Sequence, residues 1–205
     1  MPSRAVIQVV AGIAVGVYVV VLLLQGGPEG SLVAPYGLIV FLSSVVLFLF
    51  DRWLWRWPLL KRIHGRPVLD GTWHGEIKST WAPDGGDGTI VSDVFLVFRQ
   101  RFWSLSFRLL TIESESSPVS ATLSAATDGV CRFVGVYRNE PDAVHRSRSN
   151  IHYGTLTMKV PDKEVNELSG NYWTDRETTG DLVVRRLSDR PIASHADGLA
   201  EVEKH

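Results

Sequence analysis

The sequence predicts two transmembrane helices followed by an all-β domain that closes into an eight-stranded barrel. Residues 5–24 form an apolar run broken only by Gln8, and residues 32–50 form a second run without a charge. About 20 apolar residues are enough for a helix to cross a bilayer. From residue 69 to about 187, apolar and polar residues instead alternate in short segments between turn clusters. Short alternating strands at regular spacing are typical of a sandwich or a barrel.

The two apolar runs predict a hairpin of membrane helices with both chain ends in the cytoplasm. A cleaved signal peptide is the alternative for the first run, but the run is long and no A-x-A cleavage site follows it. The turn at residues 25–31 contains Glu29 and no Lys or Arg. Basic residues instead follow the second run, where the positive-inside rule places the cytoplasm. They are Arg52, Arg56, Lys61, Arg62 and Arg66.

A small-residue motif lies within the first run. Gly12 and Gly16 form a G-x-x-x-G spacing, which can let two helices approach closely. The alternative is that glycine is simply frequent in membrane helices. We expect the pair to serve helix association.

The alternating region predicts about eight strands in a domain that covers residues 67–188. About 120 residues in eight strands fit a small closed barrel that can hold one small ligand. Residues 1–66 form the helical hairpin with its basic and aromatic flank, and the polar tail 189–205 is expected to be disordered. The expected strands are 69–80, 89–100, 102–112, 117–126, 130–139, 150–160, 167–176 and 180–187.

Alternation also predicts which side chains point into the barrel. The inward rows are apolar along most of their length and carry a few polar members, which are costly to bury without partners. A polar ligand or a water-filled pocket explains them, and the alternative is that they lie at strand ends in solvent. A β-bulge would invert a row and place Trp173 and Asp175 inward instead of their neighbours. The inward polar members are Gln100, Tyr137, His152, Thr174, Arg176 and Arg186.

Composition and motifs argue against several functions. No G-x-S-x-G, H-E-x-x-H or phosphate-loop pattern occurs, and the six histidines lack metal-ligand spacing, so we expect neither an enzyme nor a metal site nor a cofactor. Residues 67–205 contain 15 basic and 20 acidic residues. That net charge of −5 disfavours a DNA or RNA polymer as partner.

Several short motifs, in their order along the chain, resemble the motifs of one known family. Residues 170–180 read G-N-Y-W-T-D-R-E-T-T-G, which is similar to the final hairpin signature G-x-Y-x-T-x-R-x-x-T-G of that family. The segment Leu69-Asp-Gly-Thr-Trp73, the pair Gln100 and Trp103, and the step His152-Tyr-Gly-Thr155 also match. The chain resembles the SMODS-associating two-TM β-strand-rich effectors of bacterial CBASS anti-phage operons over almost its whole length.

The resemblance implies a compact, antiparallel, lipocalin-like barrel beneath two helices in the bacterial inner membrane. In that family a CD-NTase of the same operon makes a cyclic oligonucleotide on infection. Binding of this oligonucleotide to the barrel drives homo-oligomerisation, disruption of the lipid bilayer and abortive infection. The alternatives are a membrane-tethered barrel that binds an apolar ligand, or one that docks a protein partner.

The resemblance also suggests roles for the inward residues. Bases stack on aromatic rings at roughly 1–3 kcal/mol each, and a guanidinium fork matches phosphate oxygens. We therefore expect stacking on four aromatic residues, phosphate contacts from two arginines, and hydrogen bonds to bases or ribose from three polar residues. In that order they are Trp73, Trp103, Tyr137 and Tyr172; Arg176 and Arg186; and Gln100, His152 and Thr174.

Overall fold

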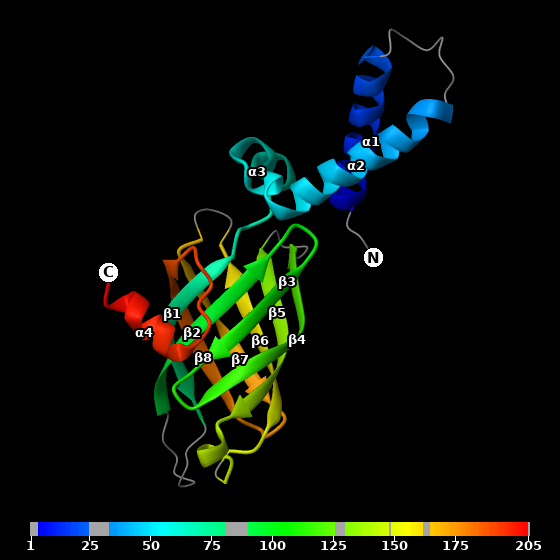
Figure 1. The fold of residues 1–205 in the computed structure, drawn as a ribbon. Coiled ribbons are helices and arrows are strands. Elements are labelled where there is room, and N and C mark those ends of the chain that lie inside the picture. Colours follow the sequence, from blue (N-terminus) through cyan, green and yellow to red (C-terminus); the bar gives the residue numbers. More distant parts are fainter. Residues whose placement is uncertain are drawn as a thin grey trace. The chain divides into compact units, whose positions relative to one another are not determined.

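A computed structural model describes the chain as two compact units (Figure 1). The first unit contains residues 1–66 together with residues 101–103, and the second contains residues 67–100 and 104–205. Each unit is described by itself below. The described residues are 4–24, 33–80, 90–125, 130–147, 149–161 and 165–204.

The first unit is helical. Helix α1 (Arg4–Leu24) contacts helix α2 (Val33–Arg52), and both coincide closely with the predicted apolar runs. The 3-10 helix η1 (Leu54–Arg56) and helix α3 (Pro58–His64) follow. Proline at the first position of α3 needs no backbone N–H partner, and Gly65 ends the helix in the left-handed conformation that favours glycine.

Neither of these helices supports the predicted membrane spans. Among the described residues, no helix combines the length and the apolar character that a membrane crossing requires. This finding contradicts the predicted spans at 5–24 and 32–50, and with them the predicted multi-pass inner-membrane location. The predicted turn at 25–31 lies outside the described residues.

The same unit contains an aromatic cluster around the buried Trp55. The rings of His64 and Phe102 lie 5.9 Å and 6.1 Å from the Trp55 ring. Nδ1 of His64 accepts the backbone N–H of Arg66 at 3.0 Å, so Nε2 carries the proton and donates to the carbonyl of Trp55 at 2.7 Å. Both ring nitrogens of His64 are therefore used, and the bond to the Trp55 carbonyl holds α3 against η1.

The second unit is a closed antiparallel barrel, which confirms this part of the predicted fold. Each strand pairs with the next along the chain, and β8 pairs with β1. The figure shows the strands wound around one axis (Figure 1). The strands are β1 (Gly71–Ser79), β2 (Ile90–Gln100), β3 (Leu105–Leu110), β4 (Ser114–Ala125), β5 (Cys131–Pro141), β6 (His152–Val160), β7 (Glu167–Thr174) and β8 (Thr179–Ser188).

The barrel interior is filled mainly by apolar and aromatic side chains. Phe133 packs edge-on against Phe98 and Phe107, with ring centroids 5.0 Å and 5.1 Å apart. The predicted inward rows of β1, β2, β5, β6, β7 and β8 follow the observed burial. In β4 a register shift between Pro118 and Ser120 changes the parity of the row, as a bulge does.

The two ends of the barrel differ. The pocket end is where β1, β3, β5 and β7 finish and β2, β4, β6 and β8 begin. The closed end is the opposite one, where Leu69, Trp73 and Gln100 are buried against one another. This difference decides which predicted residues can share a site.

The C-terminal tail contains a helix, which differs from the disorder expected for residues 189–205. Helix α4 (His195–Val202) begins at Ser194, whose side chain accepts the backbone N–H of Asp197, while the Asp197 carboxylate accepts the backbone N–H of Ser194. This capping box satisfies two backbone donors that would otherwise lack partners. The tail covers apolar side chains on the outer face of β2 and β3, which the alternation of polar and apolar residues did not predict. They are Phe95, Val97 and Leu110.

Candidate functional site

A cavity of about 290 Å³ opens at the pocket end of the barrel. Its wall consists of side chains from the strand ends together with residues of the connections β3–β4, β5–β6 and β7–β8. Five of the nine predicted ligand-binding residues line it, and they come from three neighbouring strands and one turn. They are Tyr137, His152, Tyr172, Thr174 and Arg176.

Arg176 is the cationic centre of this cavity. Its guanidinium donates from Nη1 to Oγ of Ser149 at 3.1 Å, and Nη2 lies 3.4 Å from Nε2 of His152. Both partners are neutral, and no carboxylate within the described chain forms an ion pair with it. Nε of Arg176 is buried and has no hydrogen-bond partner. Burial lowers the pKa of this arginine, yet a guanidinium stays charged in proteins. An anion with oxygen acceptors is therefore the natural missing partner.

The turn that carries Arg176 is held in a strained conformation. Glu177 has a φ of 63°, in the left-handed region that residues other than glycine rarely adopt. The hydroxyls of Thr174 and Thr178 lie 2.6 Å apart and close the turn, and the Thr174 hydroxyl also accepts the backbone N–H of Arg176. Thr174 thus positions the arginine, in addition to lining the cavity. Backbone strain that neighbouring contacts maintain is common at binding sites.

Tyr137 offers the cavity a hydrogen bond that no protein group uses. The residue is only 4% exposed, and its hydroxyl has no hydrogen-bond partner within the described residues. Burial raises the pKa of Tyr137, so the hydroxyl keeps its proton. Its ring lies over Gly154 of β6, where a Cβ would overlap with the ring. The hydroxyl is therefore a donor in the cavity lining that a ligand acceptor can use.

Tyr172 and His152 form the flanks of the arginine. The Tyr172 hydroxyl donates to Oγ of Ser79 at 2.5 Å, which fixes the ring across the cavity wall. Nδ1 of His152 lies 2.9 Å from the carbonyl of Asn150, so Nδ1 carries the proton and Nε2 is an acceptor facing Arg176. Burial, together with the charge of Arg176, lowers the pKa of His152. The imidazole is therefore neutral near pH 7.

Three of the remaining predicted residues lie at the closed end. The Gln100 side chain accepts the backbone N–H of Leu69 at 2.7 Å and donates to the carbonyl of Pro67 at 3.0 Å. Arg186 lies 4.4 Å over the Trp73 ring and donates to the carbonyl of Val68 at 2.7 Å. Their hydrogen bonds join the chain before β1 to the barrel. The structure therefore does not bring them together with Arg176.

The fourth remaining residue, Trp103, is not in the barrel. It belongs to the helical unit, where its ring lies 5.9 Å from Phe50 and 5.3 Å from Phe102, and its backbone N–H donates to Asp51. The two glycines predicted for helix association lie in α1, and a Cβ at Gly12 or Gly16 would meet nothing within 4 Å. They do not mediate the contact with α2, and their role between copies of the chain stays a prediction.

The pocket also contains residues that the sequence analysis missed. Asn139 and Ser79 continue the inward rows of β5 and β1 by one step, so a longer extrapolation of the alternation would have found them. Ser149 and His145 lie in the connection between β5 and β6, where no periodicity reports the direction of a side chain. Within the part of the chain that the structure describes, no group of three or more His, Cys, Asp or Glu could hold a metal ion.

Comparisons with known proteins match the barrel. Residues 65–186, more than half of the chain, match the family model described as Cap15, cyclic dinucleotide receptor domain. A curated relative from Staphylococcus schleiferi, CD-NTase-associated protein 15, is 25% identical over 148 residues. The matched region covers 72% of this chain and 76% of the relative. The family match includes every pocket residue discussed above.

Proposed function

The chain belongs to the family of Cap15 cyclic dinucleotide receptor domains, and from this premise we propose that its barrel binds a cyclic dinucleotide at the pocket end. Membership confirms the resemblance to CBASS effectors that the sequence motifs indicated. The binding site, its residues and the consequence of binding are the proposal.

One observation carries the proposed site. Arg176 is a partly buried guanidinium in the cavity wall; its hydrogen-bond partners are neutral, and no carboxylate among the described residues forms an ion pair with it. A phosphate diester supplies a negative charge and oxygen acceptors in the geometry that guanidinium recognises. The hydroxyl of Tyr137 offers a second donor in the same cavity. The tyrosine rings add faces on which a base can stack, at roughly 1–3 kcal/mol per base.

The pocket is largely organised before the ligand arrives. Ser149 and His152 hold the guanidinium, Thr174 and Thr178 hold its turn, and Ser79 holds Tyr172. Fewer side chains must be ordered on binding, which lowers the entropic cost of association. His152 in its neutral form contributes an acceptor to Arg176 without competing for the anion.

Binding of the nucleotide is proposed to be a signal rather than a step of catalysis. A CD-NTase would supply the ligand during infection, and the bound barrel would favour self-association of the chain and arrest of the infected cell. For this, the ligand must bind the associating state more tightly than the resting state. The bilayer disruption implied by the resemblance is not part of the proposal, because no described helix meets the requirements for crossing a membrane.

The alternative of an apolar ligand has less support from the interior. Phe98, Phe107, Phe133 and Trp73 occupy the space that an acyl chain would need. The cavity instead lies among polar residues at one end.

Calorimetry on the full chain tests the proposed function. The titrants are cyclic di-GMP, cyclic di-AMP, cyclic di-UMP and cyclic GMP–AMP at physiological salt. At least one is expected to bind, and Arg176→Ala is expected to lower the affinity about 10- to 150-fold. This range corresponds to the loss of about 1.5–3 kcal/mol from charge-assisted hydrogen bonds.

The matched control is Arg185→Ala. Arg185 is an exposed arginine on the outer face of β8 that pairs with Glu167, and its removal should leave the affinity unchanged. Equal affinity of the Arg176→Ala chain and the wild type would refute the assigned site. Absence of heat with every titrant, from a folded chain, would refute the proposed function.

A further inference from the structure

A cyclic dinucleotide has two phosphates, but the cavity lining that the structure describes contains one strong cation. Arg176 is the one arginine or lysine among the described residues that line the cavity. The other ionisable side chains around it are Glu113, His145 and His152 and the phenols of Tyr137 and Tyr172, none of which is a strong cation. If the proposed function holds, on which this inference rests, one barrel neutralises only half of the ligand's charge.

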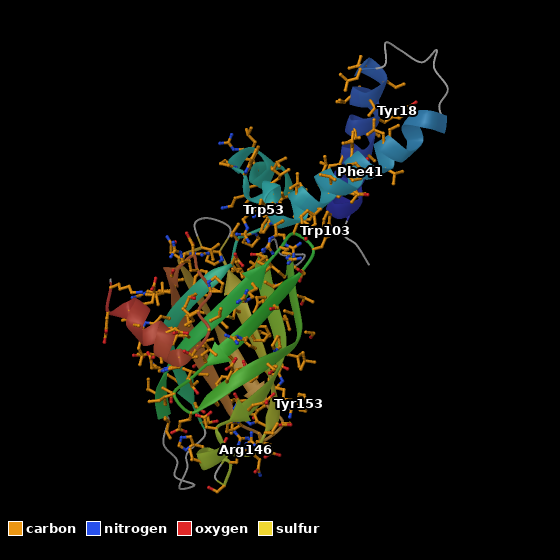
Figure 2. The ribbon with its side chains drawn as sticks, in the orientation of Figure 1. Tyr18, Phe41, Trp53, Trp103, Arg146 and Tyr153 are labelled. Carbon is orange, nitrogen blue, oxygen red and sulfur yellow. The ribbon has the colours of Figure 1, made fainter. Side chains whose placement is uncertain are left out.

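Two other arginines that the structure describes do not make up the difference. Arg186 lies at the closed end, where the carbonyls of Val68 and Asp70 and the carboxylate of Asp189 accept its hydrogen bonds. Arg146 follows η2 (Ala143–His145) at the pocket end, where its exposed side chain donates to the carbonyl of Pro141 at 3.2 Å (Figure 2). An exposed arginine gives little selective binding because solvent screens its charge.

The cavity is also small for the whole ligand. Its volume of about 290 Å³ lies at the lower edge of the about 300–1,000 Å³ of pockets that enclose drug-sized molecules. A cyclic dinucleotide is at the large end of that class. One base and one phosphate can occupy the cavity, while the second half of the ligand remains at the mouth.

The mouth itself exposes apolar side chains. Ile112, between β3 and β4, is 75% exposed, and Val144, in η2, is 79% exposed. Ile151, immediately before β6, is also exposed. Ile112 lines the cavity, and the neighbour of Val144, His145, lines it too. These exposed side chains give a second protein surface apolar area to cover at the mouth.

We propose that two copies of this chain meet mouth to mouth on one cyclic dinucleotide. Each Arg176 takes one phosphate and each cavity takes one base, while Ile112 and Val144 of the two copies pack around the ligand. The two halves of the ligand are related by two-fold symmetry, or nearly so when the bases differ, and a pair of identical chains supplies the matching symmetry. The nucleotide is then part of the interface, and the second copy completes the site.

This arrangement makes a distinctive prediction for the dependence on ligand concentration. A bridging ligand joins two chains when ligand is scarce, but an excess of ligand gives each barrel its own molecule and separates the pair. The average mass of the chain is expected to rise up to one ligand per two chains and then to fall. A ligand that acts only from within one barrel would give a mass that rises to a plateau.

Two measurements on the full chain test the inference. Calorimetry gives the molar ratio for the cyclic dinucleotide that binds best, and analytical ultracentrifugation gives the mass relative to the ligand-free chain. One ligand per two chains, with a mass that rises and then falls, is the expected result. One ligand per chain without a mass change would overturn the inference and leave the proposed function intact. No binding by any cyclic dinucleotide would overturn both.

Variants at the mouth test the proposed interface separately from ligand binding in the pocket. Val144→Asp places two like charges across the proposed interface, and it is expected to abolish the ligand-dependent doubling of mass. Val183→Asp, on the exposed outer face of β8, is the matched control and should leave the doubling intact. Pairing that survives Val144→Asp would overturn the proposed interface.

A mononucleotide and a second arginine variant complete the test. Cyclic GMP has one phosphate and should not raise the mass at any concentration. Arg146→Ala should change neither the molar ratio nor the affinity by more than about threefold, which is less than 1 kcal/mol. A large loss of affinity in Arg146→Ala together with a ratio of one would assign the second phosphate to Arg146 and overturn the inference.

Discussion

The position of the Tyr137 ring depends on the absence of a side chain at residue 154. The ring covers Gly154 on the neighbouring strand, and a Cβ there would overlap with the phenol carbons. The hydroxyl consequently faces the cavity without a protein partner. A glycine with no functional group thus determines where a ligand donor lies.

We therefore predict that Gly154→Ala moves Tyr137 and weakens ligand binding. The added methyl should lower the free energy of unfolding by about 1–3 kcal/mol, as overpacking does, and urea unfolding measures this change. In a Tyr137→Ala background the ring is absent, so Gly154→Ala should have little further effect on affinity. Additive losses in the two variants would show that Gly154 does not act through Tyr137.

His152 makes the free energy of unfolding of the barrel depend on pH. Burial lowers the pKa of His152 from its ordinary value of 6.5, so the unfolded chain binds this proton more readily than the folded chain. The free energy of unfolding therefore rises with pH in this range. It is expected to fall as the pH drops below about 6.5, until the folded-state pKa is passed. Urea unfolding at pH 7.5 and pH 5.5 measures the decrease, which His152→Gln should reduce. An equal decrease in both proteins would assign it to other groups.

Individual residues also show what the alternation of apolar and polar side chains can and cannot predict. The two-residue alternation along a strand predicts whether a side chain points inward. It identified Tyr137, His152 and Tyr172 correctly as inward. It does not report how far along the barrel axis a residue lies, because that requires the register of every strand. Gln100 and Arg186 point inward as predicted, yet they lie at the closed end and bind the backbone before β1.

At the scale of the element, helix α4 is the largest departure of the barrel unit from expectation. The tail is polar and follows Pro191, which favoured disorder. The covering of β2 could have been inferred from Val94–Phe98, a run of five apolar residues without alternation. Such a run indicates that both faces of a strand are buried. The partner on the outer face could not be identified, because a short helix gives little periodic signal.

Gly198 provides a test of how α4 is held. Alanine is favoured over glycine within a helix by roughly 1 kcal/mol, so Gly198→Ala would stabilise an undocked helix. In the structure a Cβ at this position would lie 2.7 Å from three carbons of the Phe95 ring. We predict that Gly198→Ala instead loosens α4 and increases amide exchange over residues 195–202. Slower exchange would contradict the packing of α4 on Phe95.

The helical elements α1 and α2 were correctly placed by their apolar composition, but their proposed environment was not supported. Apolar composition predicts a helix whose side chains are shielded from water. It does not by itself show which surroundings shield them. Among the described residues, no helix has both the length and the apolar character of a membrane span.

At the scale of the whole molecule, the barrel has the features of an independently folding unit. Its strand ladder closes upon itself, and its core lies within residues 67–205. A fragment that begins at Pro67 is expected to unfold cooperatively in urea and to keep the ligand affinity of the full chain within about threefold, or less than 1 kcal/mol. A fragment with no cooperative transition would show that the barrel requires residues 1–66.

The packing of the closed end has a kinetic consequence. Leu69, Trp73 and Gln100 fill the floor of the barrel, so a nucleotide in the cavity arrives and departs through the same mouth. A second molecule cannot displace the first from behind and must wait until the mouth is vacated. The nucleotide must therefore leave a cavity through the mouth by which it entered, so the rate of this exit limits how fast that barrel can be emptied.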